Sequence, residues 1–149
     1  MIRLVTTAAE WATFRALVLE YSEWLDADLC FQGFDEEVAD LARQYGPPNG
    51  AAFLAENLGC AGVRPFADEG VCELKRMYVR ADARGGGHGR ALAEHAVAEA
   101  RRLGYRTMRL DTLATMTAAI HVYEALGFRE IDAYRANPLD APRFFELVL

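Results

Sequence analysis

Four glycines lie within five positions of the segment RADARGGGHGRALAEH, residues 80–95, between a strand-like run and a strong helix-forming run. Glycine loses more conformational entropy on folding than any other residue, so a cluster of it is favoured where the backbone turns tightly or approaches a ligand closely. A glycine-rich turn that leads into a helix leaves N–H groups free, and the helix dipole favours negative charge there. The segment therefore predicts a strand–turn–helix unit that binds a phosphate group.

Two common phosphate-binding motifs do not fit this loop. The P-loop motif fails because no Gly-Lys-Ser/Thr follows the glycines. The dinucleotide motif GxGxxG fails because Leu92 occupies the place of its third glycine, and no acidic strand end follows about twenty residues later. The loop instead has the pattern Arg84-x-x-Gly87-x-Gly89.

The rest of the chain predicts one mixed α/β domain, residues 1–149, with a mostly antiparallel sheet at its start and β-α-β connections later. A capping box of Thr7 and Glu10 begins the first helix. Asp35 is the expected cap of the second helix, Gly46 its stop, and Pro65 the end of a strand. The expected helices are 6–25, 34–46, 90–103 and 117–127, and the expected strands are 1–6, 51–56, 59–66, 71–79, 105–113, 128–134 and 143–149.

Composition and charge exclude several classes of protein. The net charge of −6 argues against nucleic acid or an anionic membrane as the main partner. The chain has no apolar run of the roughly twenty residues that a membrane span needs. Its first residues, MIRLVTTAAEW, are not expected to act as a secretion signal. Its three cysteines are widely separated and form no CxxC pair, so we expect no disulfide framework or zinc site and a cytoplasmic location. They are Cys30, Cys60 and Cys72.

The pattern Arg84-x-x-Gly87-x-Gly89 resembles the Gln/Arg-x-x-Gly-x-Gly/Ala signature of the GCN5-related N-acetyltransferase (GNAT) superfamily. Two more segments resemble that superfamily in the correct order. They are MYV, residues 77–79, before the loop, and HVYEALGF, residues 121–128, which is similar to the Tyr-Glu-x-x-Gly-Phe signature of a late helix. The resemblance covers residues 50–135 closely. It implies a GNAT-like fold, with a mixed, mostly antiparallel central sheet flanked by about four helices.

The resemblance implies that the loop holds the pyrophosphate of acetyl-coenzyme A, and it implies no metal. Backbone groups of Met77 and Val79 would hold the pantetheine arm like an added strand, while Arg84 would add charge or brace the loop. The family often has an asparagine where this chain has Met116, so that coenzyme contact is lost or made by other groups. The coenzyme-binding residues implied are Met77, Tyr78, Val79, Arg84, Gly85, Gly86, Gly87, His88, Gly89 and Arg90.

Two residues are candidates for the catalytic steps. An alkylamine with a pKa of about 10 attacks a thioester only after it has lost its proton. Glu73 resembles the strand glutamate that serves as base in some family members, and the alternative is a surface or ion-paired glutamate beside Lys75 or Arg76. Tyr123 matches the tyrosine that presents its hydroxyl to the coenzyme sulfur, and the alternative is a core tyrosine. The three histidines are expected to pack or to face solvent; they are His88, His95 and His121.

The resemblance implies an N-acetyltransferase acting on a small-molecule amine, with no nucleic acid or membrane partner, and it is compatible with a homodimer. An acidic segment between Arg15 and Arg43 would attract a cationic amine, or would only solvate the surface. Arg135 and Arg143 would suit a substrate carboxylate. Two alternatives are a coenzyme-A-binding regulatory module without turnover, which Met116 favours, and an acyltransferase with a larger acyl group or an oxygen acceptor. The acidic residues are Glu20, Glu23, Asp26, Asp28, Asp35, Glu36, Glu37 and Asp40.

Overall fold

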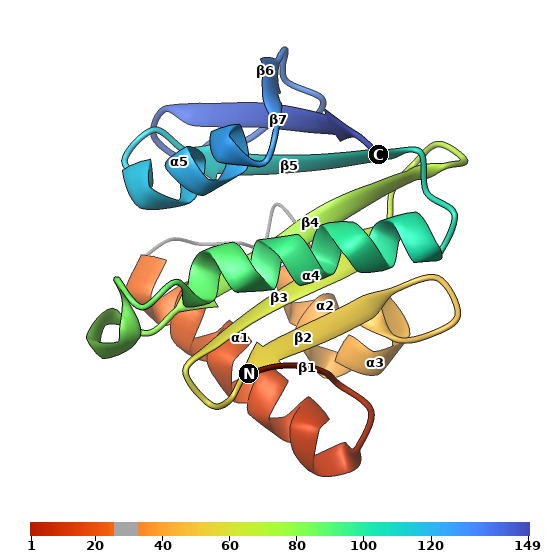
Figure 1. Ribbon diagram of the computed structural model, residues 1–149, viewed down its shortest axis with the longest axis vertical. Coiled ribbons are helices and arrows are strands. Elements are labelled where there is room, and N and C mark those ends of the chain that lie inside the picture. Colours follow the sequence, from red (N-terminus) through yellow and green to blue (C-terminus); the bar gives the residue numbers. More distant parts are fainter. Residues whose placement is uncertain (26–32) are drawn as a thin grey trace.

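The computed structural model describes residues 1–25 and 33–149 and shows a seven-stranded sheet with helices on both faces (Figure 1). The strand order is β1-β2-β3-β4-β5-β7-β6, and of these strand pairs only β4 and β5 run parallel. The strands are β1 (Ile2–Leu4), β2 (Ala51–Ala55), β3 (Gly59–Pro65), β4 (Val71–Val79), β5 (Thr107–Leu113), β6 (Arg129–Ile131) and β7 (Pro142–Val148). The helices are α1 (Ala8–Leu25), α2 (Phe34–Ala39), α3 (Leu41–Tyr45), α4 (His88–Arg102) and α5 (Thr117–Ala125).

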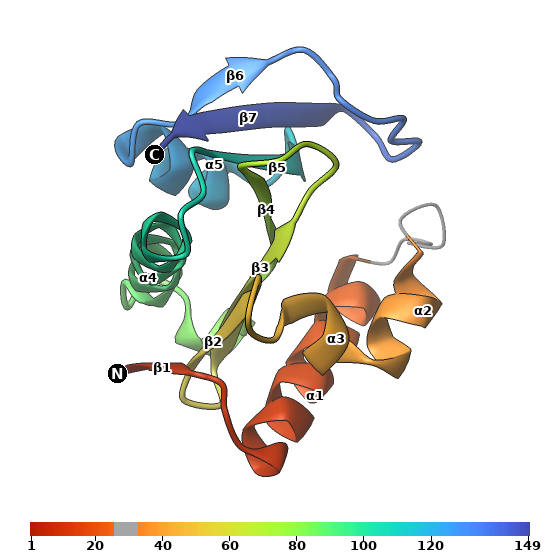
Figure 2. The same ribbon diagram turned by 90° about the vertical axis from the view of Figure 1, so that its right-hand side faces the viewer.

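The helices divide between the two faces of the sheet, as Figure 2 shows. Helices α1, α2 and α3 cover one face, and α4 and α5 cover the other. Each face has its own apolar cluster, because α1 and α4 each bury one stripe of residues at helical spacing. The predicted mixed, mostly antiparallel fold class is confirmed. None of the described helices has the length and apolar character needed to span a bilayer.

The second predicted helix is two short helices. Asp40 leaves the helical conformation, with φ −149°, and its side chain accepts a hydrogen bond from the backbone of Arg43 at the start of α3. The predicted cap at Asp35 is wrong, because the N-cap of α2 is Gly33 and Asp35 lies within the first turn. This break is why the described part of the chain has five α-helices where about four were expected. Gly46 ends α3 and Pro65 ends β3, as predicted.

Strand β4 is bulged and then separates from β5. Its pairing with β3 shifts between Cys60 and Gly62, so that two residues of β4, Arg76 and Met77, stand against one residue of β3. Arg76 has a φ of 58°, which a non-glycine residue rarely adopts. Strand β5 pairs with β4 only along the three positions that end at Glu73. The two strands then diverge, and the candidate site lies at this opening.

Candidate active site

The glycine loop is open to a ligand at the beginning of α4. Gly85 and Gly87 have φ values of 88° and 83°, in the left-handed region that glycine adopts without strain. A Cβ atom at either position would meet no other atom within 4 Å. Gly87 is the N-cap of α4, and no side chain makes a capping hydrogen bond there. The first N–H groups of α4 are therefore suited to hold an anion.

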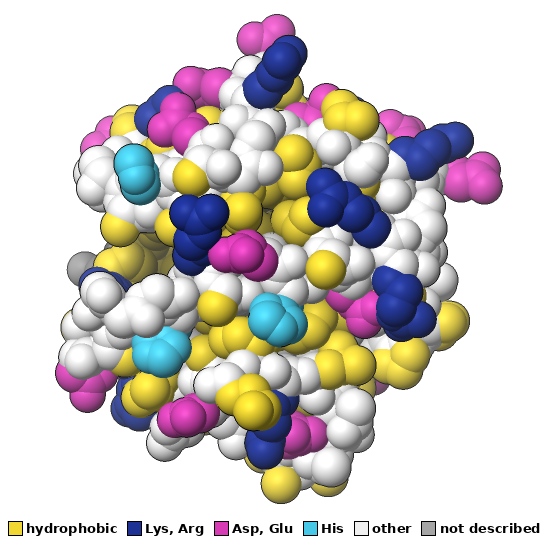
Figure 3. Space-filling model, viewed as in Figure 1, with side chains coloured by type: hydrophobic (Ala, Val, Ile, Leu, Met, Phe, Trp, Pro, Cys, Tyr) yellow, Lys and Arg dark blue, Asp and Glu magenta, His cyan; other side chains and the backbone are white. Residues whose placement is uncertain are grey.

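A groove of about 720 Å³ extends from this loop to α5. In Figure 3 a hollow with hydrophobic walls opens between the beginning of α4 and the α5 side of the molecule. Of the ten predicted coenzyme-binding residues, Gly86 lies in the loop but not on the groove wall. The structure places the other nine on that wall: Met77, Tyr78, Val79, Arg84, Gly85, Gly87, His88, Gly89 and Arg90.

Arg84 braces the loop against α1. Its Nε donates a hydrogen bond to the carbonyl of Val79 at 2.9 Å, and its guanidinium lies 4.5 Å from the ring centre of Trp24. Trp24 lines the groove and is 46% exposed, which is unusual for so large an apolar side chain. These contacts are those of a residue that braces the loop, while an added role of its charge toward a coenzyme stays a prediction.

Tyr123 is buried at the inner end of the groove, on α5. Its ring packs against Phe128 and Phe145, with ring centres 5.7 Å and 6.5 Å away. Burial raises the pKa of the Tyr123 hydroxyl, so this group keeps its proton at neutral pH. Met116, where the family often has asparagine, lines the groove beside Tyr123, and its sulfur accepts a hydrogen bond from the Thr112 hydroxyl at 3.3 Å.

Glu73 lies away from the groove in a buried ion-pair network. Its Oε2 is 2.7 Å from Arg135 and accepts a hydrogen bond from the Tyr134 hydroxyl at 2.9 Å, while its Oε1 accepts one from Arg64 at 3.2 Å. Burial by itself raises the pKa of this carboxyl, but neighbouring cations, led by Lys75 and Arg135, hold it below its ordinary value. Such a carboxylate accepts a proton weakly, so the structure favours the ion-paired alternative for Glu73.

Part of the predicted acidic wall is neutralised within the protein. Glu20 accepts hydrogen bonds from the Tyr78 hydroxyl at 2.9 Å and from Arg80 at 3.0 Å. Glu37 is 1% exposed and holds the guanidinium of Arg76 with bonds of 2.7 Å and 2.8 Å. Neither carboxylate is therefore available to attract a cationic acceptor. Three residues considered in the sequence lie outside the described ranges: Asp26, Asp28 and Cys30.

The two arginines expected to suit a substrate carboxylate bind different partners. Arg143 pairs with Glu130 at 2.7 Å, where β7 runs beside β6. Arg135, in the segment between these strands, instead contacts Glu73 at 2.7 Å and Asp111 at 3.5 Å. The structure therefore gives these two arginines no shared role.

The remaining described histidines and cysteines contribute little to the groove. His88 lines it as the first residue of α4, whereas His121 is exposed and His95 bonds to its own helix. Cys60 and Cys72 are buried, as expected, and burial raises the pKa of the Cys72 thiol to about 12. Neither thiol is a nucleophile at neutral pH.

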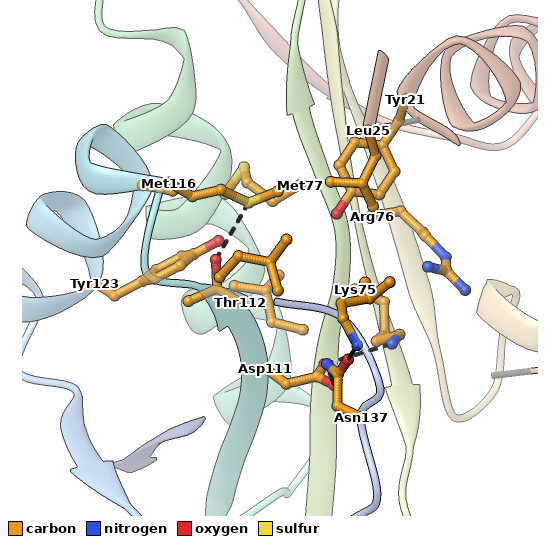
Figure 4. Close-up of a pocket in the computed structure, with 14 residues that line it drawn as sticks. Tyr21, Leu25, Lys75, Arg76, Met77, Asp111, Thr112, Met116, Tyr123 and Asn137 are labelled. Atoms are coloured by element: carbon orange, nitrogen blue, oxygen red, sulfur yellow. Dashed lines mark hydrogen bonds and ion pairs between the residues drawn. The ribbon is translucent and has the colours of Figure 1, made fainter. Parts of the chain in front are cut away.

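A smaller cavity of about 50 Å³ continues from the groove between β4 and β5. Its polar lining includes two charged side chains that the sequence did not indicate as partners, Lys75 and Asp111, whose nearest charged atoms are 3.6 Å apart. Figure 4 shows Lys75 and Asn137 both directed toward Asp111, with Tyr123 on the other side of the cavity. No motif signals these residues, because β4, β5 and the segment before β7 meet only in the folded sheet.

One protein family matches the chain over most of its length. The acetyltransferase (GNAT) family model matches residues 11–128. The chain belongs to the GNAT family. The family resemblance is confirmed, and the protein is an N-acetyltransferase of this family.

Individual relatives agree with this assignment. An uncharacterized N-acetyltransferase of Schizosaccharomyces pombe is 40% identical to this GNAT enzyme over 131 residues, which cover 85% of the chain and 80% of that protein. The N-acetylaspartate synthetase of Danio rerio is 32% identical over 100 residues, 64% of this chain and 36% of that protein. A crystal structure of a GNAT acetyltransferase from Staphylococcus aureus Mu50 has the same fold, with a TM-score of 0.77, 20% identity and 98% of each chain covered.

Proposed function

We propose that this GNAT enzyme transfers the acetyl group of acetyl-coenzyme A to the amine of a small molecule, such as an amino acid, by direct attack on the thioester. The observation that carries the proposal is that the large groove and the small cavity share one stretch of wall. A donor in the groove and an acceptor in the cavity would therefore meet beside Tyr123. The shared residues are Leu25, Met77, Leu113, Met116, Ala119 and Tyr123.

The groove fits the coenzyme that the family uses. N–H groups at Gly87 and at the first turn of α4 would hold the pyrophosphate, and the open space at Gly85 lets a phosphate approach the backbone. The backbone of Met77 and Val79 would hold the pantetheine arm, because β5 has separated from β4 at these positions. Acetyl-coenzyme A supplies the activated thioester.

Catalysis in this proposal rests on positioning and on one proton donor. The opening between β4 and β5 brings donor and acceptor together, which replaces an encounter in solution with a fixed geometry. The Tyr123 hydroxyl, which keeps its proton because burial raises its pKa, would donate to the thiolate as it leaves. The relative named N-acetylaspartate synthetase supports a small acceptor.

The proposal is tested by calorimetric binding of coenzyme A and by thiol release from acetyl-coenzyme A with a panel of amines. The panel contains amino acids, polyamines, aminoglycosides and lysine peptides. We expect the coenzyme to bind and at least one small amine to be acetylated. Coenzyme binding with no turnover of any of them would instead favour the regulatory module, and turnover of lysine peptides alone would contradict a small acceptor.

Tyr123→Phe should lower kcat by about 100-fold, the usual scale of a positioned proton donor. Coenzyme affinity should change less than about twofold, because the ring and its contacts with Phe128 and Phe145 are retained. Tyr105→Phe is the matched control, since the Tyr105 hydroxyl donates to the Asn49 carbonyl and does not line the groove. An unchanged kcat in the Tyr123 variant would make this residue a core tyrosine.

A further inference from the structure

The cavity between β4 and β5 is small, and several of the residues that line it are polar or charged. Its volume is about 50 Å³, room for a group the size of a few water molecules. Lys75, Asp111 and Asn137 line it on the side away from Tyr123 (Figure 4). A group bound there would lie beside Lys75 while the rest of the molecule extends toward the groove.

Seven charged side chains form one connected network behind this cavity. Glu37 contacts Arg76 and Arg64, and Arg64 also contacts Glu73. From Glu73 the network continues through Arg135 to the cavity. Its members, in order of contact, are Arg76, Glu37, Arg64, Glu73, Arg135, Asp111 and Lys75.

The charges of these seven described residues do not balance. Four are cations and three are carboxylates. The tyrosines that donate to the carboxylates, Tyr45 and Tyr134, stay neutral because burial raises the pKa of both hydroxyls. Among these seven residues the cations therefore outnumber the carboxylates by one. Excess charge in a buried site is unfavourable unless a counter-charge accompanies it.

Lys75 brings one of these cations to the wall of the cavity. The carboxylates of Glu37 and Glu73 each contact two arginines, with shortest distances of 2.7 Å. Lys75 is 5% exposed, and its contact with Asp111, at 3.6 Å, is the longest in the network. Asp111 also contacts Arg135 and accepts a hydrogen bond from Asn137 at 3.3 Å, so its negative charge is shared. Burial lowers the pKa of Lys75 to about 8, although the carboxylates of Glu73 and Asp111 oppose this shift.

We infer that the acceptor carries a carboxylate, which binds against Lys75 and Asn137 in this cavity and directs the amine toward Tyr123. The inference rests on the proposed function and specifies its substrate class: amino acids and other amines with a carboxylate. The bound carboxylate places a negative charge beside Lys75, in a network in which four cations contact three carboxylates. Polyamines and aminoglycosides carry further positive charge, which Lys75 would repel, so we expect them to be poor acceptors.

The test compares each of the twenty common amino acids with its carboxamide, using acetyl-coenzyme A and the rate of thiol release. We expect the best amino acid to exceed its carboxamide by at least about tenfold in kcat/KM, the effect of losing one charged contact. The amine of a carboxamide is less basic than that of the amino acid, so a larger fraction of it is neutral and able to attack. This difference alone would make the carboxamide the faster substrate, so a preference for the amino acid must come from its carboxylate. Binding of both compounds to the enzyme with coenzyme A is measured in parallel by calorimetry.

Lys75→Met should remove most of this preference by raising KM for the amino acid, with kcat for the carboxamide little changed. Lys75→Arg should restore the preference. The Met variant leaves three cations and three carboxylates, so the fold should be retained; circular dichroism checks this. Arg143→Gln is the control, since Arg143 pairs with Glu130 outside the cavity, and it should keep the wild-type preference.

The outcomes separate this inference from the proposed function. Equal turnover of amino acids and carboxamides by the wild type overturns the carboxylate site and leaves acetyl transfer standing. Amino acids that bind in preference to carboxamides, with no turnover of any amine, contradict the proposed function and support the site. If neither compound binds and none is acetylated, both are overturned.

Discussion

Replacing Gly87 with glutamate should reduce the affinity for coenzyme A by more than about 100-fold while the protein remains folded. Gly87 is the N-cap of α4, and its added Cβ would meet no atom within 4 Å, so the new carboxylate has room in the groove. It would stand where the proposal places the pyrophosphate. Two like charges about 4 Å apart near a protein surface repel by about 4 kcal/mol, which exceeds the roughly 2.7 kcal/mol of a 100-fold loss.

The matched control is Gly104→Glu, at the other end of α4. Gly104 also has a left-handed φ, of 92°, and open space at its Cβ, so both variants introduce the same charge and the same backbone strain of about 1–2 kcal/mol. Calorimetry should show wild-type affinity for the Gly104 variant. Equal affinity in both variants would mean that the loop does not hold the phosphates, and the proposed function would lose its main support.

The features that the sequence predicted well depend on residues close together in the chain. The capping box forms as expected: Thr7 and Glu10 exchange hydrogen bonds of 3.0 Å and 3.2 Å. The glycine loop is a local motif, and its neighbours in sequence are also its neighbours on the groove wall. The break at Asp40 escaped prediction because the residues on both sides of it continue one helical pattern, while Asp40 itself is a good cap for the second half.

The small cavity between β4 and β5 could not be predicted in this way, because its charged residues come together only through strand pairing. Lys75 meets Asp111 because β4 and β5 are neighbours in the sheet, and a bulge at Arg76 changes which β4 side chains face the opening. The alternation of side chains along β4 predicts neither its pairing with β5 nor the bulge at Arg76. The role of Glu73 depends likewise on Arg64 from β3 and on Arg135 from the segment before β7. Motif spacing carries no information on these partners.

Glu73→Gln should lower the free energy of unfolding by about 3 kcal/mol, the scale of breaking a buried ion pair from one side. The amide would leave Arg64 and Arg135 without their shared carboxylate in a site where Glu73 is 0% exposed. The cations hold the pKa of this carboxylate below its ordinary value, so its contribution is complete above the unfolded pKa, about 4.3, and is lost as the pH falls through the folded pKa. The stability difference between the wild type and the variant should therefore shrink in acid. Urea unfolding at several pH values measures it.

Glu130→Gln is the control for this effect, because it removes one carboxylate from an arginine pair of similar length, 2.7 Å, that lies in solvent. Its unfolding midpoint should stay close to that of the wild type, since exposed ion pairs contribute little.

The Glu73→Gln variant also decides between the two roles considered for Glu73, an ion-paired residue or a catalytic base. A structural Glu73 gives a lower unfolding midpoint and a kcat/KM profile whose acid limb is retained. A catalytic base gives the reverse: an unchanged midpoint, a large fall in kcat, and loss of that acid limb, because the group whose protonation stops the reaction is gone.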